Sequence, residues 1–175
     1  MLLLGGSVQG NTLNLANTVS TFAGSAGVNG HTDGTGTAAR FYLPTGIATD
    51  GRNLYVTDTS NHTIRKVEIA TGAVTTLAGL APFSGSTNGT GTTARFNSPY
   101  GITTDGTNLY VADTYNHIIR KVVIATGEVT TFAGMKGTSG SVDGTGTAAA
   151  FYYPYGITTD GTNLYVADTY NHTIR

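Results

Sequence analysis

The sequence predicts an all-β fold built from copies of one unit. Asn53, Asn108 and Asn163 each begin a nearly identical string, and the strings lie 55 residues apart, which is the pattern of a repeat protein. Within each copy, β-branched and aromatic residues flank an Asp-Gly turn, the strongest short signal for a β-hairpin. No apolar period of about 3.6 residues extends over a helical length. We therefore expect antiparallel strands in every copy.

The repeats divide the chain into a short N-terminal segment and three units. Residues 1–18 form the segment, and the units in register are 19–73, 74–128 and 129–175. Each unit opens with a short apolar run and continues as a long, polar, glycine-rich loop. A phenylalanine near the end of the loop is expected to pack between neighbouring units and anchor it. These residues are Phe41, Phe96 and Phe151.

The second unit illustrates the strands that we expect in each unit. Strands are predicted at 101–105, 109–112, 118–125 and 129–133. The Asp-Thr-Tyr-Asn-His string at 113–117 is a turn, because Asp, Asn and Thr side chains hydrogen-bond their own backbone. Four antiparallel strands, repeated radially, are typical of a β-propeller blade.

The repeated string resembles the NHL repeat, a family of β-propellers. Tyr-Val-Ala-Asp-Thr-x-Asn-His-x-Ile-Arg-Lys, preceded by Pro-x-Gly-Ile-x-x-Asp-Gly, recurs with small variations across 19–175. The leucine of the family's Asn-His-Leu string is replaced by Thr63, Ile118 and Thr173. The resemblance implies a propeller, most often with six blades. It implies no single function, because members serve as protein- or RNA-binding platforms, receptor domains or, rarely, lyases.

The strand count predicts assembly. The third unit stops inside its third strand, whereas 11–16 and 19–23 supply a candidate third and fourth strand. The chain thus carries about three blades, fewer than the roughly four to eight of closed propellers. We expect a C2 homodimer that closes one six-bladed ring, with residues 1–18 completing the last blade of a partner or neighbouring chain. A helical filament, or a piece of a longer repeat array, is the alternative.

Composition argues against nucleic-acid binding and a membrane span. Lys and Arg total 9 against 10 Asp and Glu, so the chain lacks the basic stripe that phosphate contacts require. No apolar run approaches the roughly 18 residues of a membrane-spanning helix. The absence of cysteine excludes disulfides and thiolate metal sites. A surface rich in Thr, Asn, Ser and Tyr favours an extracellular or cell-surface location, although the first residues lack the positive start of a signal peptide.

The repeated turn gathers an Asp, an Asn, a His and an Arg in each unit. Its members are Asp58, Asn61, His62, Arg65, Asp113, Asn116, His117, Arg120, Asp168, Asn171, His172 and Arg175. We interpret this motif as structural. A charge-assisted contact between its Asp and Arg would fix blade register, and its His would bond the backbone or a neighbouring blade. Histidines at one radius of a closed ring are also compatible with a metal site, and this alternative stays open.

No catalytic or cofactor site is predicted. The second and third units differ at only three positions between 96–120 and 151–175, whereas an active site needs different residues converging at one place. No Gly-x-Ser-x-Gly string orients a nucleophile. The Asp-Gly-Thr-Gly loops at Asp33 and Asp143 lack the ligand series of a calcium loop, and Asn88 replaces the Asp in the middle copy.

Repeated tyrosines are the candidate contact residues for a partner or a glycan. Tyr100 and Tyr155 follow the loop proline, and Tyr115 and Tyr170 lie in the repeated turn. Such rings suit stacking on sugars or on a partner's side chains, and packing between blades is the alternative. The leading hypothesis is a non-enzymatic module for protein interaction and self-assembly. A glycan- or small-ligand-binding propeller is the alternative, followed by a metal-dependent lyase or hydrolase.

Overall fold

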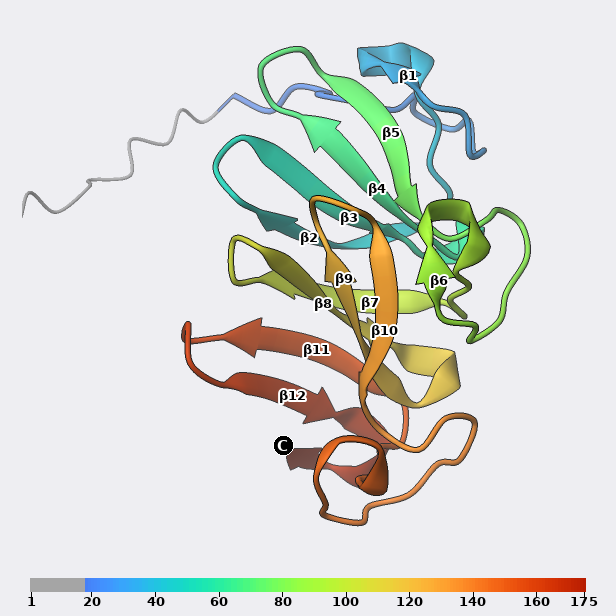
Figure 1. Ribbon diagram of the computed structural model, residues 1–175. Helices are drawn as coiled ribbons and strands as arrows, with labels where there is room; N and C mark the ends of the chain where they lie inside the picture. Colours follow the sequence, from blue (N-terminus) through green and yellow to red (C-terminus); the bar gives the residue numbers. More distant parts are fainter. Residues whose placement is uncertain (1–17) are drawn as a thin grey trace, which may run out of the picture.

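The fold is known from a computed structural model, which describes residues 18–175. Its strands form three antiparallel sheets that lie side by side, here called blades 1, 2 and 3 (Figure 1). Blade 1 contains β2 (Pro44–Thr49), β3 (Asn53–Asp58), β4 (Thr63–Glu68) and β5 (Ala73–Ala78). Blade 2 contains β7 (Pro99–Thr104), β8 (Asn108–Asp113), β9 (Ile118–Val123) and β10 (Glu128–Ala133). Blade 3 contains β11 (Pro154–Thr159), β12 (Leu164–Asp168) and β13 (Thr173–Ile174). The all-β prediction is confirmed.

Blades 1 and 2 each carry a fifth, short strand that the sequence did not predict. β1 (Gly34–Thr35) pairs with β5, and β6 (Gly89–Thr90) pairs with β10. The expectation of four strands per blade is therefore corrected to five in these two sheets. A two-residue strand shows no alternating pattern, and its glycines are typical of a loop. A short 3-10 turn follows at the equivalent place in each unit: η1 (Gly36–Ala38), η3 (Gly91–Thr93) and η5 (Gly146–Ala148).

The Asp-Gly turn between the first two strands of a blade depends on an ionised aspartate. Asp105 Oδ1 accepts hydrogen bonds from the backbone N–H groups of Thr107 and Asn108, and Gly106 has a φ of 86°. Burial opposes ionisation of Asp105, but these bonds and the hydroxyl of Tyr110 lower its pKa to about 2. The hairpin is thus held by a carboxylate at neutral pH.

Neighbouring blades pack face to face through apolar side chains. The first strands lie against one another, β2 on β7 and β7 on β11. Phe96 is fully buried in a cluster that joins Ile64 of blade 1 to Leu109 of blade 2, so this loop residue is anchored between blades. Gly101 is required at the junction, because a Cβ there would collide with the carbonyl oxygen of Tyr155. The glycine of the Pro-x-Gly-Ile string is therefore needed because the backbones of neighbouring blades approach each other closely at this position.

The expected strand at 19–23 does not form. This stretch has no strand pairing among residues 18–175, and Val19 is 97% exposed. A strand needs a hydrogen-bonded neighbour, and the candidate partner at 11–16 lies outside the described residues. The role predicted for residues 1–18 falls almost entirely outside them as well. In the described part of the chain, no helix has the length and apolar character needed to cross a membrane.

Candidate interaction surfaces

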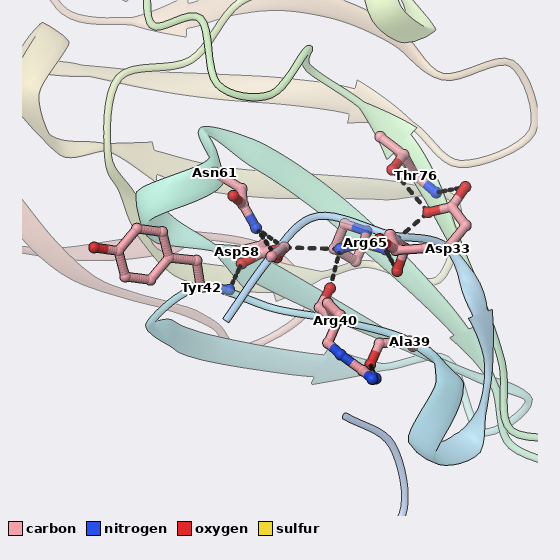
Figure 2. Close-up of polar contacts among 10 residues, drawn as sticks. Asp33, Ala39, Arg40, Tyr42, Asp58, Asn61, Arg65 and Thr76 are labelled. Carbon is pink, nitrogen blue, oxygen red and sulfur yellow. Dashed lines mark hydrogen bonds and ion pairs between the residues drawn. The ribbon is translucent and has the colours of Figure 1, made fainter. Parts of the chain in front are cut away.

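The repeated turn lies at the centre of a buried polar network (Figure 2). In blade 1, Asp58 Oδ2 accepts hydrogen bonds from Arg65 Nη1 and Asn61 Nδ2, both at 2.8 Å. Asp58 Oδ1 accepts a third from the backbone N–H of Tyr42 at 2.7 Å. The Asp58 and Arg65 side chains are 0% exposed. Since a buried charge needs partners, this pair holds the turn in one geometry.

The same arginine clamps the glycine-rich loop onto the blade. Arg65 Nη2 donates to the carbonyl oxygen of Thr32 at 3.2 Å and to Asp33 Oδ1 at 2.8 Å, and Nη1 donates to the carbonyl oxygen of Arg40 at 2.9 Å (Figure 2). The Asp33 carboxylate also accepts hydrogen bonds from the backbone N–H and hydroxyl of Thr76 in β5. The arginine therefore joins the loop, the turn and two strands.

Sequence reasoning missed this clamp, although a signal was present. Asp33, Asn88 and Asp143 each lie 32 positions before the arginine of their unit. Asn88 Oδ1 accepts a hydrogen bond from Arg120 at 2.9 Å, and Asp143 accepts one from Arg175 at 2.6 Å. The loop oxygens that a calcium site would use are engaged by an arginine in all three units.

Burial governs the ionisation of the turn aspartates. It raises the pKa of Asp113 to about 6, against the opposing effects of Arg120 and of the hydrogen bonds from Asn97 and Asn116. Burial likewise raises the pKa of Asp58. These ion pairs are desolvated, so removing one partner leaves an uncompensated charge in the interior.

The turn histidine links one blade to the next. His62 Nδ1 accepts a hydrogen bond from the backbone N–H of Ser98 at 3.0 Å, and His117 Nδ1 accepts one from Tyr153 at 3.2 Å. Burial lowers the pKa of both histidines, which keeps Nδ1 unprotonated and able to accept. His172, at the equivalent place in blade 3, makes no such bond with residues 18–175. Within that range, no three His, Asp or Glu side chains lie close enough together to bind a metal ion.

Threonine hydroxyls add a second bond between blades. Thr59 Oγ1 donates to the carbonyl oxygen of Pro99 at 2.7 Å, and Thr114 Oγ1 donates to that of Pro154 at 2.6 Å. The equivalent Thr169 donates only to Ala167 of its own blade, at 3.3 Å, among the described residues. Each internal junction thus has a histidine bond and a threonine bond.

The outer faces of blades 1 and 3 are uncovered in the described chain. Ile47 of blade 1 is 62% exposed, whereas its repeat equivalent Ile102 is 7% exposed against blade 1. Ile174 of blade 3 is 73% exposed, whereas Ile64 is 0% exposed against blade 2. The face of blade 1 contains an apolar hollow of about 360 Å³, lined among others by Phe22, Phe41, Ile47, Leu54 and Val56.

A second surface lies where the turns of blades 2 and 3 meet. Its six side chains, here called the tyrosine cluster, are Tyr100, Tyr115, Tyr152, Tyr153, Tyr155 and Tyr170. The Tyr100 and Tyr155 ring centroids are 4.6 Å apart, and Tyr153 lies 5.1 Å from Tyr115 and 5.0 Å from Tyr170. The structure thus pairs the predicted Tyr100 with Tyr155, and it links Tyr115 to Tyr170 through Tyr153. Sequence reasoning missed Tyr152 and Tyr153, although they occupy two of the three positions at which 151–175 differs from 96–120.

Comparison with known proteins identifies the family. The NHL repeat model matches residues 41–67. The chain is 36% identical over 169 residues to NHL repeat-containing protein 2 of Bos taurus and of Homo sapiens. The chain belongs to the NHL-repeat family. These alignments cover 88% of this chain but only 23% of either relative, so the chain spans about a quarter of their length.

Solved structures share the fold of this NHL-repeat chain. A protein of unknown function from Bacteroides thetaiotaomicron is 30% identical, with a TM-score of 0.64 over 70% of this chain and 31% of that one. An auxiliary nutrient binding protein from the same organism is 25% identical, with a TM-score of 0.65 over 73% of this chain and 35% of that one. Virginiamycin B lyase from Staphylococcus aureus is 19% identical, with a TM-score of 0.51 over 81% of this chain and 43% of the lyase chain. At this level of identity the likeness shows the fold alone.

Proposed function

We propose that the chain is a non-enzymatic NHL-repeat module whose outer blade faces bind further blades of the same kind. The observation that carries the proposal is the repetition of one packing face. Phe41, Ile47, Leu54 and Val56 on the open face of blade 1 are the repeat equivalents of Phe96, Ile102, Leu109 and Val111. The latter four are buried at the junction of blades 1 and 2. A surface of this composition favours burial against another blade.

A second copy of the chain is the proposed partner. Leu43 has a φ of 50°, close to the 47° of Ser98 and Tyr153, and its N–H would meet His172 Nδ1 of the other copy. The hydroxyl of Thr169 would likewise meet the carbonyl oxygen of Pro44. Two copies with about three blades each would close one six-bladed ring with C2 symmetry. In this arrangement residues 1–18 complete the last blade of the partner.

The proposed role involves no chemical step, cofactor or metal. The turn Asp, Asn and Arg side chains are all engaged in the internal network, which supports a structural role for the motif. We place the module outside the cell or on its surface because its polar residues are mainly Thr, Asn, Ser and Tyr. The partners and activity of a longer parent protein would add to this role.

The molar mass in solution tests the proposal. We expect mass photometry and light scattering to give twice the 18.0 kDa of one chain. Ile47→Asp should produce monomers, because a carboxylate on the open face opposes burial. The matched control is Ile69→Asp, an exposed isoleucine in the turn after β4, which should leave the mass unchanged. A monodisperse wild-type monomer would contradict the proposal, and masses that grow with concentration would replace the closed ring by a filament.

Ligand binding by the tyrosine cluster is the second candidate function. The observation that favours it is the grouping of tyrosines between blades 2 and 3, where Tyr100 lies beside Tyr155 and Tyr153 lies between Tyr115 and Tyr170. Similarity to a structure named an auxiliary nutrient binding protein supports a ligand-binding role for a fold of this kind. This function and the assembly role are compatible, because they use different surfaces.

A further inference from the structure

The two internal blade junctions have the same framework but different surfaces. Both contain the histidine–backbone bond and the threonine–carbonyl bond described above. Three positions that carry Ser60, Asn97 and Ser98 at the first junction carry Tyr115, Tyr152 and Tyr153 at the second. Since the first junction forms with small polar side chains, tyrosines are not needed to hold two blades together. The tyrosines of the second junction are therefore an addition to a framework that both junctions share.

Tyr153 occupies a backbone conformation that disfavours a bulky residue. Its φ is 47°, the same as that of Ser98 at the first junction. A large side chain at positive φ is uncommon, because its Cβ crowds the backbone, and such outliers gather at functional sites. Leu43 and Ser98 share this conformation, so the position accepts side chains of different sizes.

The hydroxyl groups of the cluster are available for bonding. Three tyrosines outside the cluster each donate a hydrogen bond to the aspartate of the Asp-Gly hairpin in their own blade. They are Tyr55, Tyr110 and Tyr165, with distances of 2.8, 3.1 and 2.8 Å. By contrast, no hydrogen bond joins a hydroxyl of the tyrosine cluster to any residue in 18–175. The phenols of Tyr100, Tyr115, Tyr153 and Tyr170 also contribute, after burial, to the raised pKa of Tyr155.

A histidine lies beside these rings. The ring centroid of His117 lies 4.6 Å from that of Tyr153 and 5.7 Å from that of Tyr152. Burial lowers the pKa of His117, so the imidazole is neutral at pH 7. The cluster contains no Lys or Arg, which the phosphates of a nucleic acid would require. Tyr115 and Tyr170, which are 47% and 54% exposed, offer ring surface to a ligand.

We propose that the tyrosine cluster binds a neutral glycan through the C–H faces and hydroxyl groups of its pyranose rings. A pyranose has an apolar face that packs on an aromatic ring and a rim of hydroxyls that bonds phenols. An amphipathic surface of tyrosines matches both properties. The inference deepens the second candidate function and rests on it. It is independent of the ring assembly, because all six tyrosines belong to one chain.

The test replaces the second junction's surface with that of the first. The double variant Tyr152→Asn and Tyr153→Ser installs side chains that this framework already accommodates. The probes are neutral gluco-, manno-, galacto- and N-acetylglucosamine oligosaccharides on an array, followed by calorimetry on those that bind. We expect the full wild-type chain to bind at least one series, and the double variant and Tyr170→Ala to lose about tenfold or more in affinity. Tyr165→Ala, which removes an exposed tyrosine outside the cluster, should bind like wild type.

Three outcomes would overturn the inference. Failure of the folded wild type to bind any neutral series at millimolar concentration is one, and equal binding by the double variant is another. A peptide ligand that is lost in the double variant, with no glycan bound, would make the surface a protein-docking site. Molar mass is measured for every variant. Loss of glycan binding at unchanged mass, or monomeric Ile47→Asp that still binds glycan, separates this inference from the assembly proposal.

Discussion

Blades 2 and 3 have almost the same residues but very different burial. Ile119 in β9 is 1% exposed, whereas its equivalent Ile174 is 73% exposed. The Arg120 side chain is 0% exposed and that of Arg175 is 16% exposed, although both pair with an aspartate and a loop residue. The difference arises from the neighbouring strands each blade has, since the local sequence is the same. In a repeat fold, the contribution of a residue to the free energy of unfolding therefore depends largely on the adjoining unit.

The ion pair of the turn should show the largest contrast. Arg120→Ala leaves Asp113 buried without its partner and should destabilise the fold by about 3–5 kcal/mol. Arg175→Ala should cost less, about 1–2 kcal/mol, because water reaches this arginine and can hydrate the remaining carboxylate. Urea unfolding measures both, with the exposed Arg52→Ala as a control. Equal losses at the two arginines would contradict the view that the neighbouring strands set the cost.

The apolar blade faces give the next largest contrast. Ile102→Ala should lose about 2–4 kcal/mol, because it leaves a cavity between blades 1 and 2. Ile47→Ala should lose less than about 1 kcal/mol in a dilute, monomeric sample. If copies assemble through this face, the cost of Ile47→Ala should grow with protein concentration. Thermal melts at two concentrations measure this, and a concentration-independent cost would argue against assembly.

The histidine bond should contribute less, and its contribution should depend on pH. His117→Gly removes the acceptor for the Tyr153 N–H and should cost about 1 kcal/mol more at pH 7.5 than the matched change His172→Gly. Glycine also tolerates the left-handed conformation of both sites.

The sign of the pH effect follows from burial, which lowers the pKa of His117 below its usual 6.5. Below that pH the unfolded chain binds the proton more readily than the folded one, so stability falls as the pH drops toward the folded pKa. Unfolding series between pH 7.5 and 5 should show a shallower decline in His117→Gly than in His172→Gly. Parallel curves would remove His117 as the titrating group.

The loop clamp should give the smallest effect. Asn88→Asp would pair Arg120 with a second carboxylate, as Asp33 does for Arg65, and should stabilise blade 2 by about 0.5 kcal/mol. The gain is small because the Asp33 side chain is 50% exposed. Asp33→Asn is the reverse change and should lose a similar amount in urea unfolding. A destabilising Asn88→Asp would show that the desolvation of the second carboxylate exceeds its attraction to Arg120.

The strands and turns were largely predictable, because their signals are local and each was repeated three times. The Asp-Gly hairpin at Asp105 and the turn before His117 follow from residue types at adjacent positions. The fifth strand was missed because Gly34–Thr35 is too short to show a strand pattern and pairs with β5, which is distant in the sequence. The expected strand at 19–23 does not form among residues 18–175, because strand propensity does not show whether a hydrogen-bonded neighbour is present there. The clamp between Asp33 and Arg65 and the tyrosine cluster depend on contacts between distant positions.

The positive-φ position at Leu43, Ser98 and Tyr153 has a consequence for how such arrays diversify. At Ser98 and Tyr153 the backbone N–H donates to the histidine of the preceding blade, so the side chain is not needed for this contact. One unit can therefore be duplicated nearly unchanged while this position and the one before it acquire new residues. Ser98 and Tyr153 are two different residues at this equivalent position within one chain. New recognition surfaces would then arise on the rim of a propeller without redesign of the blade beneath.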